Sequence, residues 1–253
     1  MDKIEKAQIP IPCEKPFHVT ELIQVEKNVI FLRVEIDDTQ KILSHILDTI
    51  SSKSWITKFE DPMTRASYEI RLNKTISDIA KNIENEDPGK ITKVTGEKVV
   101  SELGRQAIVD SLQYKDIPLG DVFKQAATGN GGFDMFSENH QHEPLFGEAK
   151  YLSGINAYGS AFSQIQTFIE EERAVSDYVD VKDFFSEDAK KKMESGERGY
   201  IAAFSSVGTA SKVLLENIKQ NQHYTWICIK GTEIVLVAVN TKREKNDTED
   251  KNG

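Results

Sequence analysis

The sequence predicts an α/β protein whose core runs helix, three-strand meander, helix, strand, with an N-terminal β/α extension before it. Two kinds of segment carry this prediction. Apolar residues recur at helical spacing in several segments, which is typical of amphipathic helices. Short runs rich in β-branched and aromatic residues lie between them, which is typical of strands. Short Gly-, Asn- and His-containing spacers separate the central strands, which favours antiparallel neighbours there.

The N-terminal β/α region is expected over residues 1–89. Its expected elements are a strand at 29–36, a helix at 37–55, a second strand at 67–72 and a second helix at 75–85. Glu86, Asp87, Pro88 and Gly89 supply turn residues, so we expect the domain boundary there.

The main domain is expected over residues 90–240. Its core comprises a helix at 96–112, strands at 120–126, 131–137 and 144–151, a helix at 160–172 and a strand at 200–206. A polar connector joins 172 to about 199, and after the core we expect a helix at 209–221 and strands at 224–230 and 233–240. Residues 241–253 contain no large apolar side chain, which predicts a disordered tail.

Composition limits the class of protein. No apolar run is long enough to span a bilayer, and the start MDKIEKAQIPIP lacks the pattern of a signal peptide, so we expect a cytoplasmic protein without membrane contact. Cys13 and Cys228 lie far apart without a CxxC pair, which predicts two reduced thiols and no zinc knuckle.

The net charge of -9 argues against a broadly basic surface. Nucleic-acid binding normally needs a surplus of Lys and Arg over the binding face. A nuclease of this composition therefore needs a local positive groove, metal ions that offset its carboxylates, or a partner that holds the nucleic acid. Lys98, Arg105, Lys124 and Lys150 are the residues expected to supply a local positive rim.

Asp134, Glu148 and Lys150 form the clearest chemical pattern in the chain. Asp134 lies on one predicted strand, and Glu148-Ala149-Lys150 ends the next. Because side chains alternate along a strand, Glu148 and Lys150 face the same side. Carboxylate oxygens suit hard divalent cations, and a nearby amine can orient water or stabilise negative charge. The pattern predicts metal-assisted phosphodiester hydrolysis with Asp134 and Glu148 as metal ligands.

An acid two residues before a lysine is weak evidence by itself. Residues 180–182, 188–190 and 249–251 match the same pattern loosely, but they lie in polar segments where solvated charges are expected. Only Glu148 and Lys150 end an apolar strand that follows another strand carrying its own acid.

With these residues in this order, the chain resembles the PD-(D/E)xK, or restriction-endonuclease-like, nuclease superfamily. The resemblance covers about residues 91–206. It implies a Mg²⁺-dependent deoxyribonuclease, with Mn²⁺ as an alternative metal, and catalytic roles for Asp134, Glu148 and Lys150. It also implies a further carboxylate on the first core helix, for which Glu97 is preferred over Glu102. Gln164 precedes Phe168 where some branches have Q-x-x-x-Y, so the aromatic hydroxyl of that motif is missing.

More narrowly, the stretches TGEKVV, GGFDMF, GEAKYLSGINAY and SQIQTFIEEERAVSDY resemble the HamA nuclease subunits of Hachiman antiphage defence systems. This resemblance implies that DNA is the substrate and that a HamB-like helicase is the partner. Two other readings stay open: a catalytically silent nuclease-fold subunit that mediates protein interactions, and an RNA-directed nuclease of the same fold.

Other residues are expected to be structural. His140 and His142 have metal-ligand spacing but no third ligand nearby, so a solvated loop is favoured. Residues 129–132 are Gly-rich without the GK[ST] of a phosphate loop, which indicates a turn. Of Trp55 and Trp226, which could stack bases, Trp226 is expected in the core.

Overall fold

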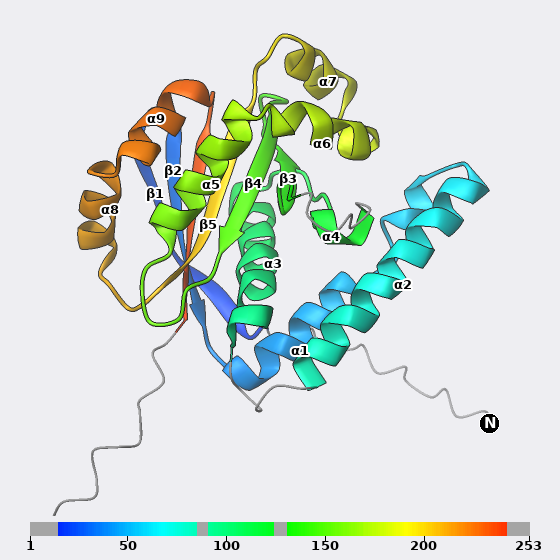
Figure 1. The fold of residues 1–253 in the computed structure, drawn as a ribbon, viewed down its shortest axis with the longest axis horizontal. Helices are drawn as coiled ribbons and strands as arrows, with labels where there is room; N and C mark the ends of the chain where they lie inside the picture. The colour runs from blue at the N-terminus through cyan, green and yellow to red at the C-terminus, as the bar shows by residue number, and fades with distance from the viewer. Residues whose placement is uncertain (1–14, 85–90, 124–130, 242–253) are drawn as a thin grey trace, which may run out of the picture.

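A computed structural model describes residues 15–84, 91–123 and 131–241. Within these ranges six strands form one mixed sheet in the order β1-β2-β6-β5-β4-β3 (Figure 1). The strands are β1 (Phe17–Glu26), β2 (Val29–Ile36), β3 (Met135–Glu138), β4 (Pro144–Lys150), β5 (Gly199–Ser206) and β6 (Ile234–Asn240). The pairs β2/β6, β6/β5 and β5/β4 are parallel, whereas β1/β2 and β3/β4 are antiparallel. The α/β fold class is therefore confirmed.

Helices cover both faces of this sheet. They are α1 (Thr39–Ile50), α2 (Pro62–Glu84), α3 (Lys93–Leu112), α4 (Gly120–Phe123), α5 (Tyr158–Glu170), α6 (Arg173–Val181), α7 (Glu187–Glu194), α8 (Ser211–Lys219) and α9 (Gln222–Lys230), with 3-10 turns at Ile56–Lys58 and Lys182–Phe184. A Cβ on Gly104 of α3 would lie 3.0 Å from Ala203, whereas Phe162 of α5 packs on Phe204. Neighbouring strand residues point to opposite faces, so α3 and α5 cover opposite sides of β5.

The central strands are apolar on both faces because both faces are covered. Every residue of β5 and β6 is buried, and β2 is buried at six of its eight positions. The strands expected at 29–36, 144–151, 200–206 and 233–240 and the helices expected at 37–55, 96–112, 160–172 and 209–221 are confirmed within a few residues, although α1 ends at Ile50. Since β2 pairs with β6, the N-terminal region shares one sheet with the main core.

The strand expected at 67–72 is wrong, because α2 runs unbroken through it. Tyr68, Leu72 and Ile79 are buried at helical spacing across the two elements that had been expected there. Asp61 accepts hydrogen bonds from the backbone N–H and the hydroxyl of Thr64 at 2.7 and 2.6 Å, which caps the start of the helix. A short window rich in β-formers had hidden this longer period.

The strand expected at 224–230 is also wrong. Asn221 accepts hydrogen bonds from the N–H groups of His223 and Tyr224 and begins helix α9. Trp226 is accordingly a helix residue, only partly buried against the core, with Lys230 Nζ 5.4 Å from its ring centroid. Trp55 is the buried tryptophan, in contact with Phe59, Tyr68 and Phe184.

Three further expectations change. The strand expected at 120–126 begins instead as the short helix α4, so the described part of the meander has two strands, β3 and β4. The sequence interpretation missed strand β1, and the polar connector contains α6 and α7. The turn at 86–89, Lys124, Cys13 and the tail after Thr241 lie outside the described residues. Within the described ranges, no helix has the length and apolar character that crossing a bilayer requires.

Candidate active site where β3 and β4 separate

Asp134 lies where strand β3 leaves its partner β4. The β3/β4 ladder runs from Glu138 and Pro144 to Met135 and Gly147. The last three residues of β4 pair only with β5 among the described strands. There the carboxylate of Asp134 accepts a hydrogen bond from the backbone N–H of Ala149 at 2.9 Å. The Asp134 side chain thus replaces the missing backbone acceptor, and this holds its carboxylate at the backbone of Ala149, the residue between Glu148 and Lys150 in the sequence.

The backbone around Asp134 is held from several elements. The N–H of Phe133 donates to the Asp177 carboxylate of α6 at 2.7 Å, and the N–H of Asp134 donates to the Gly147 carbonyl at 2.8 Å. The N–H of Gly120 donates to the Asp134 carbonyl, also at 2.8 Å. A Cβ on Gly147 would lie 2.3 Å from Met135 Cγ, so only glycine lets the two strands approach this closely.

Glu148 and Lys150 face the same side, as the alternation of side chains predicts. Glu148 Oε1 lies 2.7 Å from Lys150 Nζ. Glu148 is only 3% exposed, and its second oxygen, Oε2, is buried without a hydrogen-bond partner among the described residues. Leaving a buried carboxylate oxygen unsatisfied is costly. Buried side-chain oxygens are normally paired, so a bound water or a cation would satisfy this one.

Glu97 joins this cluster, and Glu102 does not. Lys150 Nζ lies 3.6 Å from Glu97 Oε1. Gly96 allows this approach, because a Cβ there would lie 2.2 Å from the ring of Tyr151, which follows β4 directly. Glu102 is 1% exposed, but its carboxylate binds Arg105 and Gln106 instead. The preference for Glu97 therefore agrees with the geometry.

Gln164, the remaining supporting candidate, lies on α5 and is partly buried. No hydrogen bond or ion pair described in the structure links it to Asp134, Glu148 or Lys150. The structure does not bring Gln164 into the cluster.

Two more charged side chains adjoin the site, Lys98 of α3 and Asp121 of α4. Lys98 Nζ contacts the Asp121 carboxylate. The Asp121 backbone carbonyl accepts a hydrogen bond from Thr75 of α2 at 2.8 Å, which fixes α4 in place. The sequence interpretation missed Asp121 because residues 120–126 were expected to be a strand. The polar Gly120-Asp121 pair was the only local signal against that expectation.

The pKa values of Asp134 and Glu148 are raised, because both carboxyl groups are shielded from water and lie near other acids. Burial raises the pKa of Asp134 to about 6, and nearby Asp121 adds to the rise, against the opposing effects of Lys98, the Ala149 N–H and Lys150. Burial also raises the pKa of Glu148 well above its usual range, with Asp134 and Glu97 adding to it. These shifts mean that the ionised carboxylates lack enough positive charge around them.

The two amines remain cations. Burial by itself would lower the pKa of Lys150, but Glu148, Glu97 and Asp134 outweigh burial and raise it. The same balance raises the pKa of Lys98, where Asp121, Asp134 and Glu97 outweigh burial. Both side chains therefore carry a positive charge at neutral pH.

The residues fit a hard divalent cation held partly by water. No group of three or more His, Cys, Asp or Glu side chains in the described ranges is arranged to enclose a metal ion. Mg²⁺, however, is usually bound by one or two carboxylates together with waters and substrate phosphates. Asp134 and Glu148 supply two carboxylates, and the unpartnered Glu148 Oε2 supplies a free acceptor.

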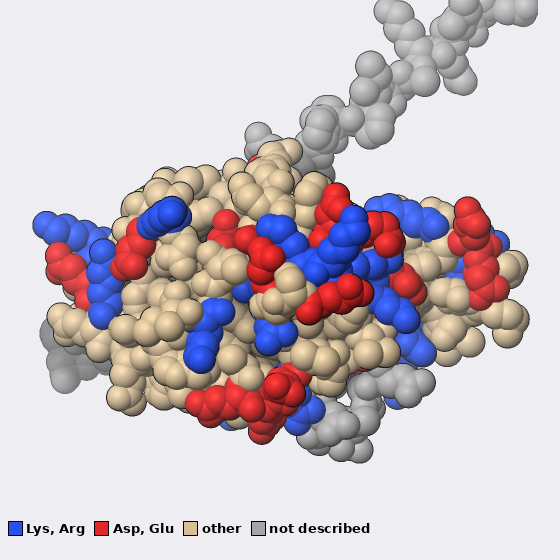
Figure 2. Space-filling view, turned by 90° about the horizontal axis from the view of Figure 1, so that it is seen from above, with Lys and Arg blue, Asp and Glu red and all other residues tan. Residues whose placement is uncertain are grey.

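The expected positive rim is compensated by acids. Arg105 pairs with Glu102 and Asp116, Lys98 with Asp121, and Lys150 with Glu148 and Glu97, whereas Lys124 lies outside the described residues. Figure 2 shows the same mixture on one whole face, where Lys and Arg lie among Asp and Glu without a broad area of one sign. This face offers no general attraction to a phosphate backbone.

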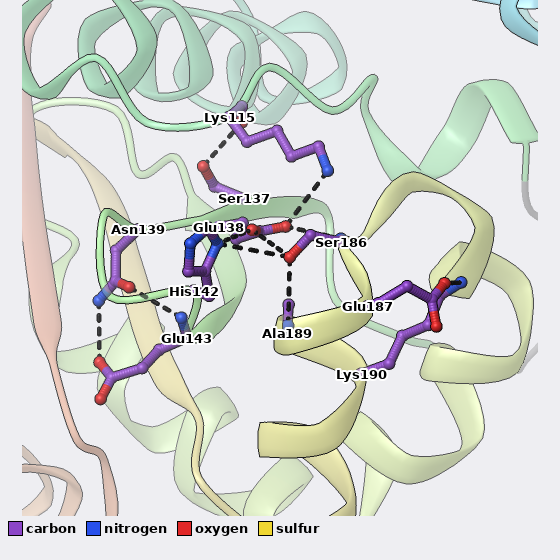
Figure 3. A network of polar contacts seen from close by, with 10 residues as sticks. All are labelled: Lys115, Ser137, Glu138, Asn139, His142, Glu143, Ser186, Glu187, Ala189 and Lys190. Atoms are coloured by element: carbon purple, nitrogen blue, oxygen red, sulfur yellow. Dashed lines mark hydrogen bonds and ion pairs between the residues drawn. The ribbon is translucent and has the colours of Figure 1, made fainter.

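Of the two histidines that were set aside, His142 belongs to a network of polar contacts around Glu138 (Figure 3). His142 Nδ1 lies 2.7 Å from Glu138 Oε1, and the hydroxyl of Ser186 donates to the same oxygen at 2.6 Å. Ser186 also caps α7 through the N–H of Ala189. His140 Nε2 instead lies 2.9 Å from the Leu112 carbonyl. The network joins the β3–β4 hairpin to α7.

Comparisons with protein-family models, curated proteins and solved structures found no significant match to this chain. The functional argument therefore rests on the residues of the site and their geometry.

Proposed function

We propose that this chain is a divalent-metal-dependent nuclease that hydrolyses phosphodiester bonds in DNA. The observation that carries the proposal is the buried, unpartnered Oε2 of Glu148, next to Lys150 and within electrostatic reach of Asp134. Among the described residues, Ser206 Oγ and Glu233 Oε1 are also buried without a partner, but Glu148 Oε2 is the one beside Lys150 and Asp134. An unsatisfied oxygen beside a second ionisable acid is what a cation-binding site presents in the absence of its cation.

Asp134 and Glu148 would hold the metal, preferably Mg²⁺, with Mn²⁺ as the alternative. A bound divalent ion there would activate water and offset the charge that develops on the phosphate. Glu97 forms a second ion pair with Lys150, beside the one with Glu148, and would help to orient the Lys150 amine.

Lys150 is proposed to act as a cation. The neighbouring acids raise its pKa, so at neutral pH it is a poor proton acceptor. Its role is then to hold the attacking water or to stabilise the additional negative charge on the phosphate.

The arrangement supports the expected family resemblance without depending on it. The elements α3, β3, β4, α5 and β5 occur in the core order of PD-(D/E)xK nucleases, with α4 in place of the first core strand and with α6 and α7 inserted between α5 and β5. Strand β5 is parallel to β4. The first core strand of that family was expected at 120–126, where residues 120–123 form α4.

We further propose that the nuclease acts in the cytoplasm of a prokaryote as the effector of an antiphage defence complex, with a HamB-like helicase. The net charge of -9 and the compensated cations around the site support the need for a partner that delivers DNA. A chain of this charge meets DNA slowly by itself, and more so at low salt.

The test is cleavage of supercoiled plasmid DNA with Mg²⁺ or with EDTA, with and without a HamB-like helicase. Wild type should cut with Mg²⁺, and Glu148→Gln and Lys150→Ala should lose at least about a hundredfold in rate. Lys190→Ala, which removes a surface ion pair with Glu187, is the matched control. Equal cutting by wild type and both site variants would remove the catalytic assignment.

One observation favours a second candidate, a catalytically silent interaction subunit. Each described cation near the site is paired with an acid, which leaves little free positive charge for DNA. Metal-independent behaviour and no cutting of DNA or of RNA, even with the partner present, would favour this candidate.

A further inference from the structure

We propose that Lys98 binds a phosphate of the nucleic-acid substrate beside the scissile bond, and that Asp121 holds Lys98 until the phosphate displaces it. This inference rests on the proposed nuclease function. It assigns a specific substrate contact to a lysine of the expected positive rim that lies outside the Asp134, Glu148 and Lys150 pattern. Lys98 is a direct substrate ligand in this account, and Asp121 is a positioning residue.

The position of the pair places it at the site. Lys98 follows Glu97, the helix residue that contacts Lys150. Asp121 follows Gly120, whose N–H is bonded to the carbonyl of Asp134 at 2.8 Å. The pair therefore lies close to Asp134, and the positive charge of Lys98 lowers the pKa of the Asp134 carboxylate against the effect of burial.

The pair is open enough to exchange partners. The side chains of Lys98 and Asp121 are 33% and 41% exposed. In the Glu148–Lys150 pair the acid is 4% exposed, and in the Glu102–Arg105 pair it is 1% exposed. Exposed ion pairs contribute little stability because water and salt screen them. A phosphate, which carries the same charge type as a carboxylate, can replace Asp121 at low cost.

The charge balance of the site requires such a cation. The proposed phosphate site lies close to four acids, which are Glu97, Asp121, Asp134 and Glu148. Lys150 is engaged by Glu148 and Glu97, whereas Lys98 has only Asp121 as an ion-pair partner in the described structure. A lysine is a compact point charge on a flexible stem, which suits a contact that must swing between two anions.

The experiment measures the affinity of fluorescein-labelled DNA by anisotropy with Ca²⁺ in place of Mg²⁺, over a range of NaCl. Lys98→Ala should weaken binding several-fold and lower the slope of log Kd against log salt by about 1, because one phosphate contact is lost. Lys98→Arg should keep most of the affinity, and Lys190→Ala should behave as wild type. Thermal unfolding checks that each variant is folded.

Asp121→Asn should tighten binding several-fold, and this gain should largely vanish in the Lys98→Ala background. An equal gain in both backgrounds would show that Asp121 acts only by general repulsion, and would overturn the exchange. Wild type without measurable DNA affinity even in the presence of a HamB-like helicase, or Lys98→Ala with unchanged affinity and slope, would overturn the phosphate contact.

The two proposals fail separately. Lys98-dependent DNA binding without any cleavage would keep this inference and remove the nuclease function. Cleavage that needs Glu148 and Lys150 but is indifferent to Lys98, in binding and in KM, would keep the nuclease and remove this inference.

Discussion

Replacing Asp134 by Asn should stabilise the metal-free protein while it abolishes the proposed activity. Asn keeps an oxygen that accepts the Ala149 N–H bond, but it carries no charge. Burial and the charge of Asp121 disfavour the ionised form of Asp134. The negative charge of Asp134 in turn disfavours the ionised form of Glu148. Functional sites commonly hold such unfavourable charges, at a cost in stability.

The magnitude follows from the pKa of Asp134. This pKa rises from 3.8 to about 6, and each unit corresponds to about 1.4 kcal/mol, so ionised Asp134 costs at most about 3 kcal/mol. The side chain keeps some contact with solvent, and screening reduces the expected gain to about 1–2 kcal/mol. For a domain of this size, that gain raises Tm by about 2–8 °C.

The sign depends on pH. A carboxyl group whose folded pKa is raised binds more protons in the folded state, so the wild type loses stability as pH rises from 3.8 to about 6. The advantage of Asp134→Asn should therefore be absent below pH 4, grow between pH 4 and 6, and be complete at pH 8. Thermal unfolding in EDTA across this range measures it.

Asp188→Asn is the matched control, because Asp188 lies exposed on α7 in an ion pair with Lys191 and should show little change at pH 8. Destabilisation by Asp134→Asn at pH 8, or a gain of equal size at pH 4 and pH 8, would refute the reasoning from buried charge.

Three further outcomes are expected. Mg²⁺ should raise the Tm of wild type more at pH 8 than at pH 5, since protons compete for Asp134 and Glu148, and should not raise that of Asp134→Asn. Glu138→Gln should lose up to about 3 kcal/mol at pH 7 in urea unfolding. Burial raises the Glu138 pKa, but hydrogen bonds with Ser186 and His142 and the charge of Lys115 outweigh burial and lower this pKa from 4.5 to about 2. This loss should fade as pH falls from 4.5 toward 2. Gly147→Ala should lower the free energy of unfolding by about 1–3 kcal/mol or more, because the added Cβ would lie 2.3 Å from a Met135 side-chain carbon. Gly131→Ala should change it little, because the nearest atom to a Cβ there, on the Phe168 ring, is 3.8 Å away.

Much of the candidate site could be predicted because its members are close in sequence. The strand expected at 131–137 begins only at Met135, so Asp134 directly precedes β3, whereas Glu148 lies on β4. The antiparallel pairing of β3 with β4 across a short loop brings the two acids close together. The alternation of side chains then places Lys150 beside Glu148. The preference for Glu97 over Glu102 also agrees with the contacts, since helix periodicity separates the two.

Two of the wrong strand predictions share one cause. Residues 67–72 and 224–230 are rich in β-branched and aromatic residues, yet both lie in helices, because packing on neighbouring elements overrides weak intrinsic preference. A window of six or seven residues cannot reveal a helical period that continues on either side of it.

By itself, the sequence determined the α/β class, the central buried strands and the local grouping of Asp134, Glu148 and Lys150, since these follow from periodicity and from short-range pairing. Only the tertiary structure decided that β2 joins β6, that Glu148 Oε2 is left unsatisfied, and that Lys98 meets Asp121 from 23 residues away. Such contacts depend on how whole elements pack, and burial and charge balance are properties of that packing rather than of any local pattern.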